Sequence, residues 1–191
     1  RAQRTWTAED SAASRRAYSG KVALADHCLG RVLAAVDGQA WVIVTADHGE
    51  LLGDHGFHGK VLPFESSIRV PLIIRPPGGT QGRVDRGVTE LLDVVATIRG
   101  IAGREASASL VDRVRSPSSA SPRSVVFANL GYVGLRTPEL TLTWDARTGD
   151  RLEVFDRSVD PQQLENRVED PRYRDPLRAG WAVVRSGDSN R

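Results

Sequence analysis

Residues 41–60 read WVIVTADHGELLGDHGFHGK, and this stretch decides the fold. Its first five residues, Trp41 to Thr45, are apolar or β-branched, which is typical of a short strand covered on both faces of a parallel sheet. An acidic residue and a histidine, Asp47 and His48, follow where that strand ends. In open α/β sheets, ligands bind beyond the carboxyl ends of the strands. The stretch therefore predicts an α/β fold with a functional site at this edge.

The loop after this strand carries the chemically useful side chains. It holds three of the four histidines and one of only two lysines in the chain. Asp47 and His48 offer a carboxylate and an imidazole, a pair that suits Ca²⁺ with further oxygen ligands, or Mn²⁺ or Zn²⁺ with more nitrogen. Lys60 would place a compact positive charge on a tetrahedral oxyanion or a leaving-group oxygen, and His55 or His58 could donate a proton to the leaving group. We therefore expect metal ligands and catalytic residues in one loop.

Each assignment has a structural alternative. Asp47 and His48 would also fit a hydrogen-bonded turn, because Asp is common in turns. Packing within the loop or exposure to solvent would account for His55 and His58 equally well. Two ligands do not complete a metal site, so at least one or two further carboxylates are expected from elsewhere in the protein.

Patterns on either side of the loop predict the rest of the first region. Thr7 and Asp10 form a capping-box pattern for a helix that reaches about Val36. A second buried parallel strand is expected over residues 70–74. A second helix, capped by Thr89, should follow and end at Gly103. Its buried face is expected to consist of Leu91, Val94, Val95, Ile98, Ile101 and Ala102.

The pattern changes after that helix. Residues 104–123 are rich in Ser, Pro and Arg, which predicts a surface loop. Short apolar runs at 124–128, 131–135, 140–144 and 152–155 predict a small antiparallel sheet, followed by charged, loop-like chain from Asp156 onward. The expected domains are therefore residues 1–103, the loop 104–123, and a C-terminal subdomain over 124–191.

Composition limits the function classes. The pI is near 9.0, but the net charge is only +2 and the basic residues are interleaved with 24 Asp+Glu, which argues against a nucleic-acid partner. No apolar run is long enough to cross a bilayer, and one cysteine cannot form an internal disulfide. The cellular location stays open. Because the chain has no Met and opens at Arg1, we expect it to be part of a longer protein.

Several segments, in this order, resemble the sulfatase family of the alkaline-phosphatase-like superfamily. The segments are VIVTADHGELLGDH at 42–55, Gly59-Lys60, and PFESSIRVPLII at 63–74. The flanking helices and the residues around 134–137 and 152–166 extend the resemblance. It implies the C-terminal part of an alkaline-phosphatase-like α/β sandwich of parallel sheets, followed by a small antiparallel α+β subdomain.

The resemblance also implies roles for single residues. Asp47 and His48 would bind one divalent cation, most often Ca²⁺ in sulfatases, and Lys60 would contact the sulfate and its bridging oxygen. Sulfatases use a formylglycine made from Cys or Ser in a Cys/Ser-x-Pro-x-Arg motif. Cys28 is followed by Leu-Gly-Arg, and this sequence contains no such motif. We therefore expect the formylglycine and the paired aspartates in a missing N-terminal half of the same protein.

The sequence thus predicts a sulfatase-like hydrolase that acts on small-molecule or glycan sulfate esters. The 191-residue chain alone is expected to be inactive. Two alternatives stay open. One is a phosphonate or phosphate ester hydrolase of the same superfamily, and the other is a catalytically inactive binding module.

Overall fold

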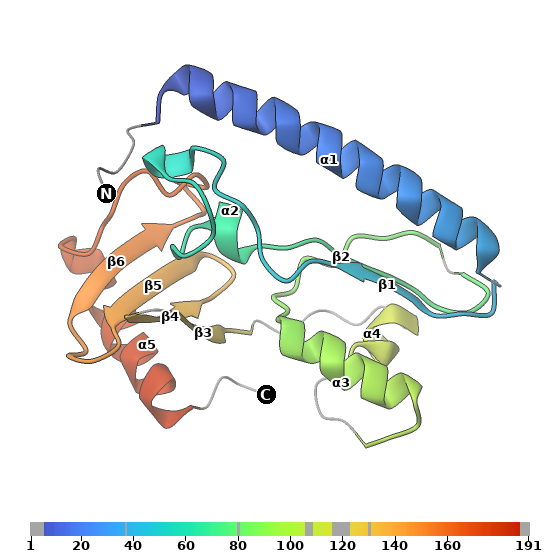
Figure 1. Cartoon of the computed structure of the whole chain (residues 1–191). Helices are drawn as coiled ribbons and strands as arrows, with labels where there is room; N and C mark the ends of the chain where they lie inside the picture. Colours follow the sequence, from blue (N-terminus) through green and yellow to red (C-terminus); the bar gives the residue numbers. More distant parts are fainter. Residues whose placement is uncertain are drawn as a thin grey trace. The chain divides into compact units, whose positions relative to one another are not determined.

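The computed structural model describes residues 6–36, 38–79, 81–105, 109–115, 123–129 and 131–187. The chain forms two compact units, Arg1–Gln81 and Gly82–Arg191, and each is described by itself. In Figure 1 the first runs from blue to green and the second from green to red. The division at residue 81 lies inside the first predicted domain, and the predicted domain boundaries at 103 and 123 stay a prediction.

The first unit begins with a long helix, α1 (Ala8–Ala35). The Thr7 hydroxyl accepts a hydrogen bond from the Asp10 amide at 3.1 Å, and the Asp10 carboxylate accepts one from the Thr7 amide at 3.1 Å. This reciprocal pair is the predicted capping box, which is confirmed. None of the described α1 side chains is buried, and Leu24 is 63% exposed. The helix therefore owes its start to capping rather than to a buried apolar face in this chain.

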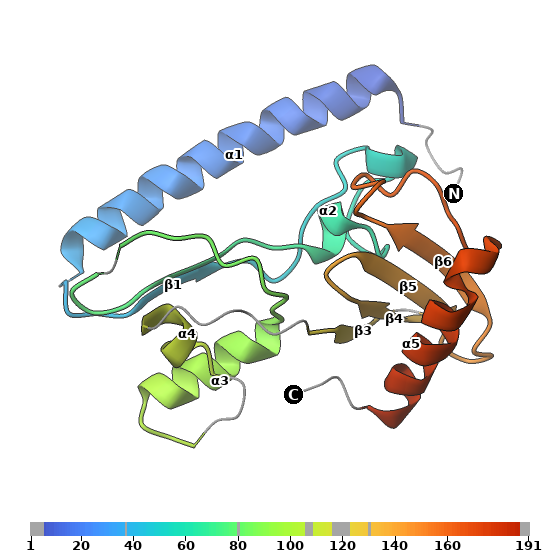
Figure 2. The same ribbon diagram turned by 180° about the vertical axis from the view of Figure 1, so that it is seen from behind.

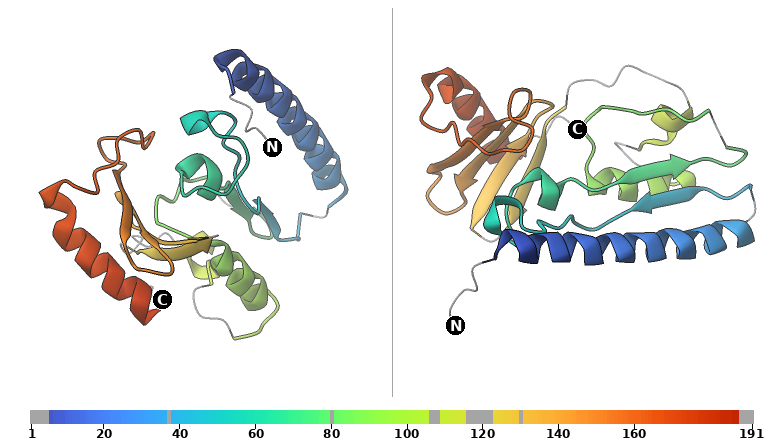
Figure 3. Two further views of the ribbon diagram at one scale, coloured as in Figure 1. Left: turned by 60° about the vertical axis from the view of Figure 1, so that its left-hand side comes forward. Right: turned by 90° about the horizontal axis from the view of Figure 1, so that it is seen from above.

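The two predicted strands of the first unit form, but their pairing differs from the prediction. β1 (Val42–Thr45) and β2 (Leu72–Arg75) pair antiparallel, with Val42 opposite Arg75 and Thr45 opposite Leu72 (Figure 3). A parallel pair needs a crossover that carries the chain back to the starting end of the sheet. Here the connection folds into a compact loop, so the chain returns antiparallel. The expected cover on both faces is also wrong within this chain, since Ile73 is 61% exposed.

The second unit begins with α3 (Leu91–Ile101) and the short α4 (Val111–Arg115). The N-cap of α3 is Glu90, one residue later than predicted. The predicted apolar face is buried only in part, since Val94 is buried but Val95 and Ile98 are 55% and 54% exposed. α4 corrects the prediction that 104–123 is loop throughout, although 106–108 and 116–122 lie outside the described residues.

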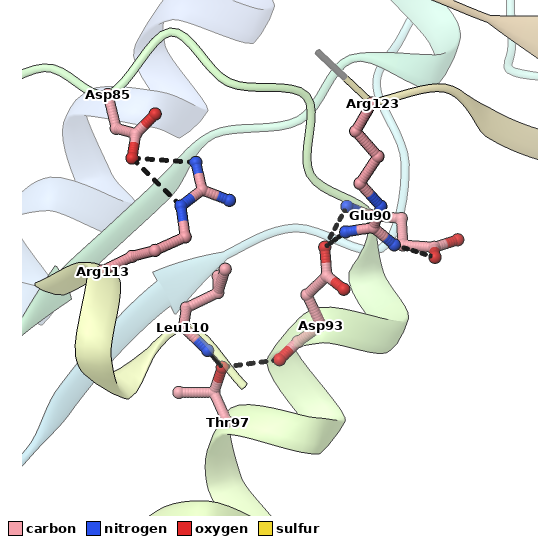
Figure 4. A network of polar contacts seen from close by, with 7 residues as sticks. All are labelled: Asp85, Glu90, Asp93, Thr97, Leu110, Arg113 and Arg123. Carbon is pink, nitrogen blue, oxygen red and sulfur yellow. Dashed lines mark hydrogen bonds and ion pairs between the residues drawn. The ribbon is translucent and has the colours of Figure 1, made fainter. Parts of the chain in front are cut away.

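The buried side of α3 is polar, and Figure 4 shows why. Arg123 donates to Asp93 Oδ2 at 2.7 Å and to Glu90 Oε1 at 2.6 Å. The Thr97 hydroxyl donates to the Asp93 carbonyl at 2.6 Å and accepts from the Leu110 amide at 2.9 Å. Because a buried charge needs a partner, this network turns the Asp93–Thr97 side of α3 inward, while Val95 and Ile98 stay exposed.

The predicted antiparallel sheet is confirmed. β3 (Val125–Asn129), β4 (Tyr132–Arg136), β5 (Leu140–Asp145) and β6 (Arg151–Asp156) pair in that order, each antiparallel to the next (Figure 2).

A helix that the sequence analysis missed covers one face of this sheet. α5 (Arg174–Ser186) follows the short 3₁₀ turn η2 (Pro171–Tyr173), and Figure 3 shows it along the sheet. Added at Gly180, a Cβ would lie 3.0 Å from side-chain atoms of Leu142 and Trp144, so helix and sheet are in close contact. The prediction of loop-like chain after Asp156 is therefore wrong for α5. The packed core consists of Leu135, Leu142, Trp144, Val154, Tyr173 and Leu177.

Within the described residues, no helix combines the length and the apolar composition that crossing a bilayer requires.

Candidate active site

The loop after β1 is anchored by a glycine that approaches another backbone closely. The Gly49 amide donates to the Ser67 carbonyl at 2.7 Å. A Cβ at Gly49 would lie 2.1 Å from the Ser66 carbonyl oxygen, so no other residue fits without movement. Ser66 and Ser67 belong to the short helix α2 (Glu65–Ile68). The contact therefore holds Asp47 and His48, just before Gly49, against α2.

Backbone hydrogen bonds also close the loop further along. The Leu51 amide donates to the Gly59 carbonyl at 2.9 Å, and the Gly59 amide donates to Glu50 Oε1 at 2.5 Å. Leu51 is fully buried between these bonds. The chain between them includes the 3₁₀ turn η1 (Asp54–Gly56). Lys60 thus leaves the loop beside the residues at which the loop began.

Asp47, His48 and Lys60, three of the predicted site residues, lie together. Lys60 Nζ is 2.5 Å from His48 Nε2, which in turn is 3.3 Å from Asp47 Oδ2. His48 Nδ1 is 2.8 Å from the Gly49 carbonyl oxygen. Since a carbonyl only accepts, Nδ1 carries the proton in the neutral ring and the Nε2 lone pair faces Lys60 and Asp47. The Asp47 side chain is 84% exposed, so a ligand can reach it.

These donors fit a divalent cation. Metal–ligand distances of about 2.0–2.6 Å place neighbouring donors about 3 Å apart, close to the 3.3 Å between His48 Nε2 and Asp47 Oδ2. A backbone carbonyl on the second ring nitrogen also orients ligating histidines in metal sites. In the described part of the chain, no three His, Cys, Asp or Glu side chains gather as a metal site needs. Further ligands would have to join these two.

The other two predicted histidines are engaged in stacking. The His55 ring stacks on Phe64 with centroids 3.6 Å apart and planes 10° apart. The His58 ring stacks on Trp6 with centroids 3.4 Å apart and planes 21° apart. The Nε2 atom of His58 is buried and has no hydrogen-bond partner in the structure as described. Among the described residues, neither ring makes a hydrogen bond, ion pair or ring contact with Asp47, His48 or Lys60, so the structure brings three of the five predicted residues together.

Ser67 is the residue that the sequence analysis missed. Its side chain is buried, and its hydroxyl donates to the Lys60 carbonyl at 2.8 Å while its own carbonyl accepts from Gly49. One residue therefore positions both ends of the site loop. A serine in a short helix gives no sequence signal of this role, because the role depends on a contact seven residues away.

α1 contacts the same loop. Arg15 Nη2 donates to Asp54 Oδ1 at 2.5 Å, and its Nε donates to the Leu52 carbonyl at 3.2 Å. A Cβ at Gly53 would lie 2.2 Å from the Ser11 hydroxyl oxygen. These contacts hold the outer turn of the loop, away from Lys60.

The sequence of the chain matches one protein family. A family model described as "Sulfatase" matches residues 1–104. The chain is 42% identical over 92 residues to the multifunctional alkaline phosphatase superfamily protein PehA of Trinickia caryophylli, covering 44% of this chain and 18% of that protein. It is 27% identical over 183 residues to an arylsulfatase of Clostridium perfringens, covering 86% of this chain and 38% of that protein.

The fold matches as well. The phosphonate monoester hydrolase of Agrobacterium radiobacter superposes with a TM-score of 0.75 at 24% identity, over 97% of this chain and 44% of that one. This likeness confirms the predicted α/β fold class. The chain spans less than half the length of these relatives. Because the family model matches more than half of its residues, the chain belongs to the sulfatase family.

Proposed function

We propose that this chain carries part of the active site of a hydrolase that cleaves sulfate esters. The observation that supports the proposal is the convergence of Lys60, His48 and Asp47 at the end of β1. One positive charge and two potential metal ligands at one point suit an oxyanion that develops negative charge in the transition state. Membership of the sulfatase family supports the same conclusion.

In this proposal the three residues have separate roles. Asp47 and His48 hold one divalent cation, most often Ca²⁺ in the family, with Mn²⁺ and Zn²⁺ as alternatives. When bound, the cation polarises the sulfate oxygens as a Lewis acid. Lys60 neutralises charge on the sulfate or on the bridging oxygen as the ester bond breaks. Ser67 positions Lys60 through its backbone carbonyl.

The nucleophile is expected outside this chain. Because the sequence contains no Cys/Ser-x-Pro-x-Arg motif, we propose that a formylglycine and the remaining metal ligands come from another part of the protein. The 191 residues alone should show no sulfatase turnover. Sequencing upstream DNA tests this: an in-frame motif supports it, whereas a stop codon followed by a start near Arg1 contradicts it.

His58 and His55 remain proposed proton donors with different support. The unpartnered, buried Nε2 of His58 leaves a donor that a substrate or another part of the protein could use. The close stacking of His55 on Phe64 favours a packing role. We expect His58→Gln to lower the rate and to steepen its dependence on leaving-group pKa, because the leaving oxygen would then depart without a proton. His55→Gln should lower stability more than rate.

The full-length protein is the material for the main test. We expect hydrolysis of 4-nitrophenyl sulfate, and Lys60→Ala should lower kcat/KM by about 10²–10³-fold, the usual cost of losing one transition-state charge contact. Lys21, the other lysine of the chain, lies exposed on α1, so Lys21→Ala is the matched control. Asp47→Asn should lower the metal content measured by mass spectrometry. A Lys60→Ala enzyme with full activity would contradict the proposal.

The runner-up activity is phosphonate ester hydrolysis. Its support is the superposition of the Agrobacterium radiobacter phosphonate monoester hydrolase on 97% of this chain. Both chemistries use a tetrahedral oxyanion, so the same three residues would serve either. The ratio of kcat/KM for 4-nitrophenyl sulfate to that for 4-nitrophenyl phenylphosphonate decides between them. Turnover of neither ester, together with no bound metal, would favour the inactive binding module.

The proposed substrates are small-molecule or glycan sulfate esters. The similarity to an arylsulfatase over 86% of this chain supports a small sulfate ester. Aryl and sugar sulfates compared in the same assay would separate the two substrate groups.

A further inference from the structure

A pocket of about 280 Å³ lies in the second unit, between α5 and the turn that joins β5 to β6. None of the residues proposed for sulfate ester hydrolysis lines it. The lining side chains are aromatic, aliphatic or cationic, and none is acidic. The lining residues are Trp144, Gly149, Arg151, Arg174, Leu177, Arg178 and Trp181.

Core residues form the apolar part of the pocket. Trp144 and Leu177 are 1% and 2% exposed, and the Trp144 and Trp181 rings lie with centroids 5.6 Å apart at 38°. At Gly149, where φ is +77°, a Cβ would lie 2.7 Å from Trp181 Cζ2. The turn backbone therefore lies directly against the indole. An aromatic surface of this kind offers large contact area to a flat ring.

The turn beside the pocket is held in place by its own hydrogen bonds. Asp145 Oδ1 accepts from the amides of Arg147 and Thr148, each at 2.8 Å. The Gly149 amide donates to the Asp145 carbonyl at 2.9 Å. A pocket with fixed walls needs little ordering when a ligand enters, which favours binding.

The pocket brings three arginines together. Elsewhere in the chain Arg15, Arg113 and Arg123 each pair with a carboxylate at 2.5–2.8 Å. The guanidinium groups at the pocket form no ion pair or hydrogen bond with any described residue. With a net charge of only +2 for the chain, this is a local concentration of unpaired positive charge. Such a concentration attracts and holds anions.

We propose that this pocket binds a ring that carries an oxyanion, either a sulfate or sulfonate group or a carboxylate. Guanidinium groups bind such groups with paired hydrogen bonds, while the ring lies against the partly exposed Trp181 indole. The volume is near the lower end of the roughly 300–1,000 Å³ of ligand pockets, so one ring with its substituent fits. The proposal does not depend on the Lys60 site.

Isothermal titration with toluene-4-sulfonate tests the proposal, because its carbon–sulfur bond is not a substrate for ester hydrolysis. The titrated protein is the full-length Lys60→Ala variant, so that binding at the proposed sulfate site is weakened. Methanesulfonate supplies the anion without the ring, and 4-methylbenzyl alcohol supplies the ring without the anion. We expect toluene-4-sulfonate to bind at least tenfold more tightly than either. Equal binding of methanesulfonate or of the alcohol would overturn the proposal.

Charge-removing variants locate the binding. Arg174→Gln with Arg178→Gln should weaken toluene-4-sulfonate binding at least tenfold. Arg185 lies exposed on α5 and does not line the pocket, so Arg185→Gln is the matched control and should change nothing. Unchanged affinity in the double variant, with its thermal unfolding intact, would overturn the proposal. Comparison of 4-methylbenzoate with toluene-4-sulfonate shows which oxyanion the pocket prefers.

Discussion

The sheet of the second unit and the site loop of the first unit hold their shapes by different means. The sheet packs α5 against a core that includes Leu142, Trp144 and Leu177, each 1–2% exposed. In the described part of the first unit, the buried apolar side chains are Leu51 and Phe64 with the prolines Pro63 and Pro76. There, backbone hydrogen bonds and the close approach at Gly49 fix the loop.

This difference follows from the side chains in each region, which are charged and exposed in the loop and apolar and buried in the sheet. In the proposed function Lys60 and Asp47 stay accessible to a substrate or metal, and burying their charges in an apolar core would cost desolvation free energy. Hydrogen bonds to their neighbours in the chain can hold them without covering them. Precision in the loop therefore comes from backbone contacts, whereas stability in the sheet comes from apolar burial.

The largest expected effect comes from a substitution in the apolar core beneath the sheet of the second unit. Leu142→Ala should destabilise the protein by about 2–5 kcal/mol, because it leaves a cavity beneath α5. Urea unfolding followed by tryptophan fluorescence measures it. Leu24→Ala, on the exposed face of α1, is the control and should cost less than about 0.5 kcal/mol. Equal destabilisation by the two substitutions would show that Leu24 is buried in the whole protein. The two units would then not differ in how much apolar burial stabilises them.

Gly49→Ala tests the backbone contact that holds the site loop of the first unit. The added methyl would collide with the Ser66 carbonyl, 2.1 Å away, and separate the loop from α2. We expect a loss of about 1–3 kcal/mol of stability from overpacking, and a fall in kcat/KM of at least about tenfold, equivalent to 1.4 kcal/mol. Gly20→Ala is the control, because a Cβ there meets nothing within 4 Å on α1. It should raise stability slightly. Normal activity in Gly49→Ala would refute the role of this contact.

The sequence predicted elements whose causes are local. The capping box of Thr7 and Asp10 and the short apolar runs of β3 to β6 involve neighbouring residues, so both could be recognised. The antiparallel pairing of β1 with β2 could not, because it depends on the path of the loop between them. α5 was missed although Leu177, Trp181 and Val184 recur at helical spacing, because its many charged residues were interpreted as a loop.

For the site, too, the residues that are neighbours in the sequence could be predicted, whereas the contacts made when the loop folds could not. Asp47, His48 and Lys60 lie in one stretch with a recognisable family pattern, and they come together in space. The stacking of His55 on Phe64, and the hydrogen bond from Ser67 to Lys60, depend on how the loop folds onto α2. No residue pattern along the chain reports such contacts.

A smaller effect sharpens the account of the loop. Ser67→Ala removes the hydrogen bond to the Lys60 carbonyl, which is worth about 1 kcal/mol, and should lower kcat/KM about five- to tenfold. Ser67→Thr should restore part of the rate, and Ser66→Ala is the neighbouring control. In the Lys60→Ala background, Ser67→Ala should change kcat/KM little further, because the two act through one side chain. Additive losses would contradict a positioning role.

The smallest expected effect is on stability at low pH, to which the charged Asp170 at the start of η2 in the second unit contributes. Hydrogen bonds from the Arg172 side chain and amide lower the pKa of Asp170 to about 2. An unfolded aspartate has a pKa of about 3.9, so the charged form stabilises the folded state above about pH 4, and this contribution is lost as the pH falls toward 2. Asp170→Asn should therefore unfold earlier than the natural protein at pH 6 in urea, and the gap should close by pH 2.

Asp26→Asn is the control for this measurement in the first unit. It removes the same charge from an exposed position on α1 where no hydrogen bond or ion pair to another described residue forms. Its unfolding midpoint should differ less from that of the natural protein at pH 6 than the midpoint of Asp170→Asn does. A pH-independent gap for Asp170→Asn would mean that the turn at η2 is held by packing of Tyr173, already part of the core, rather than by the charged cap.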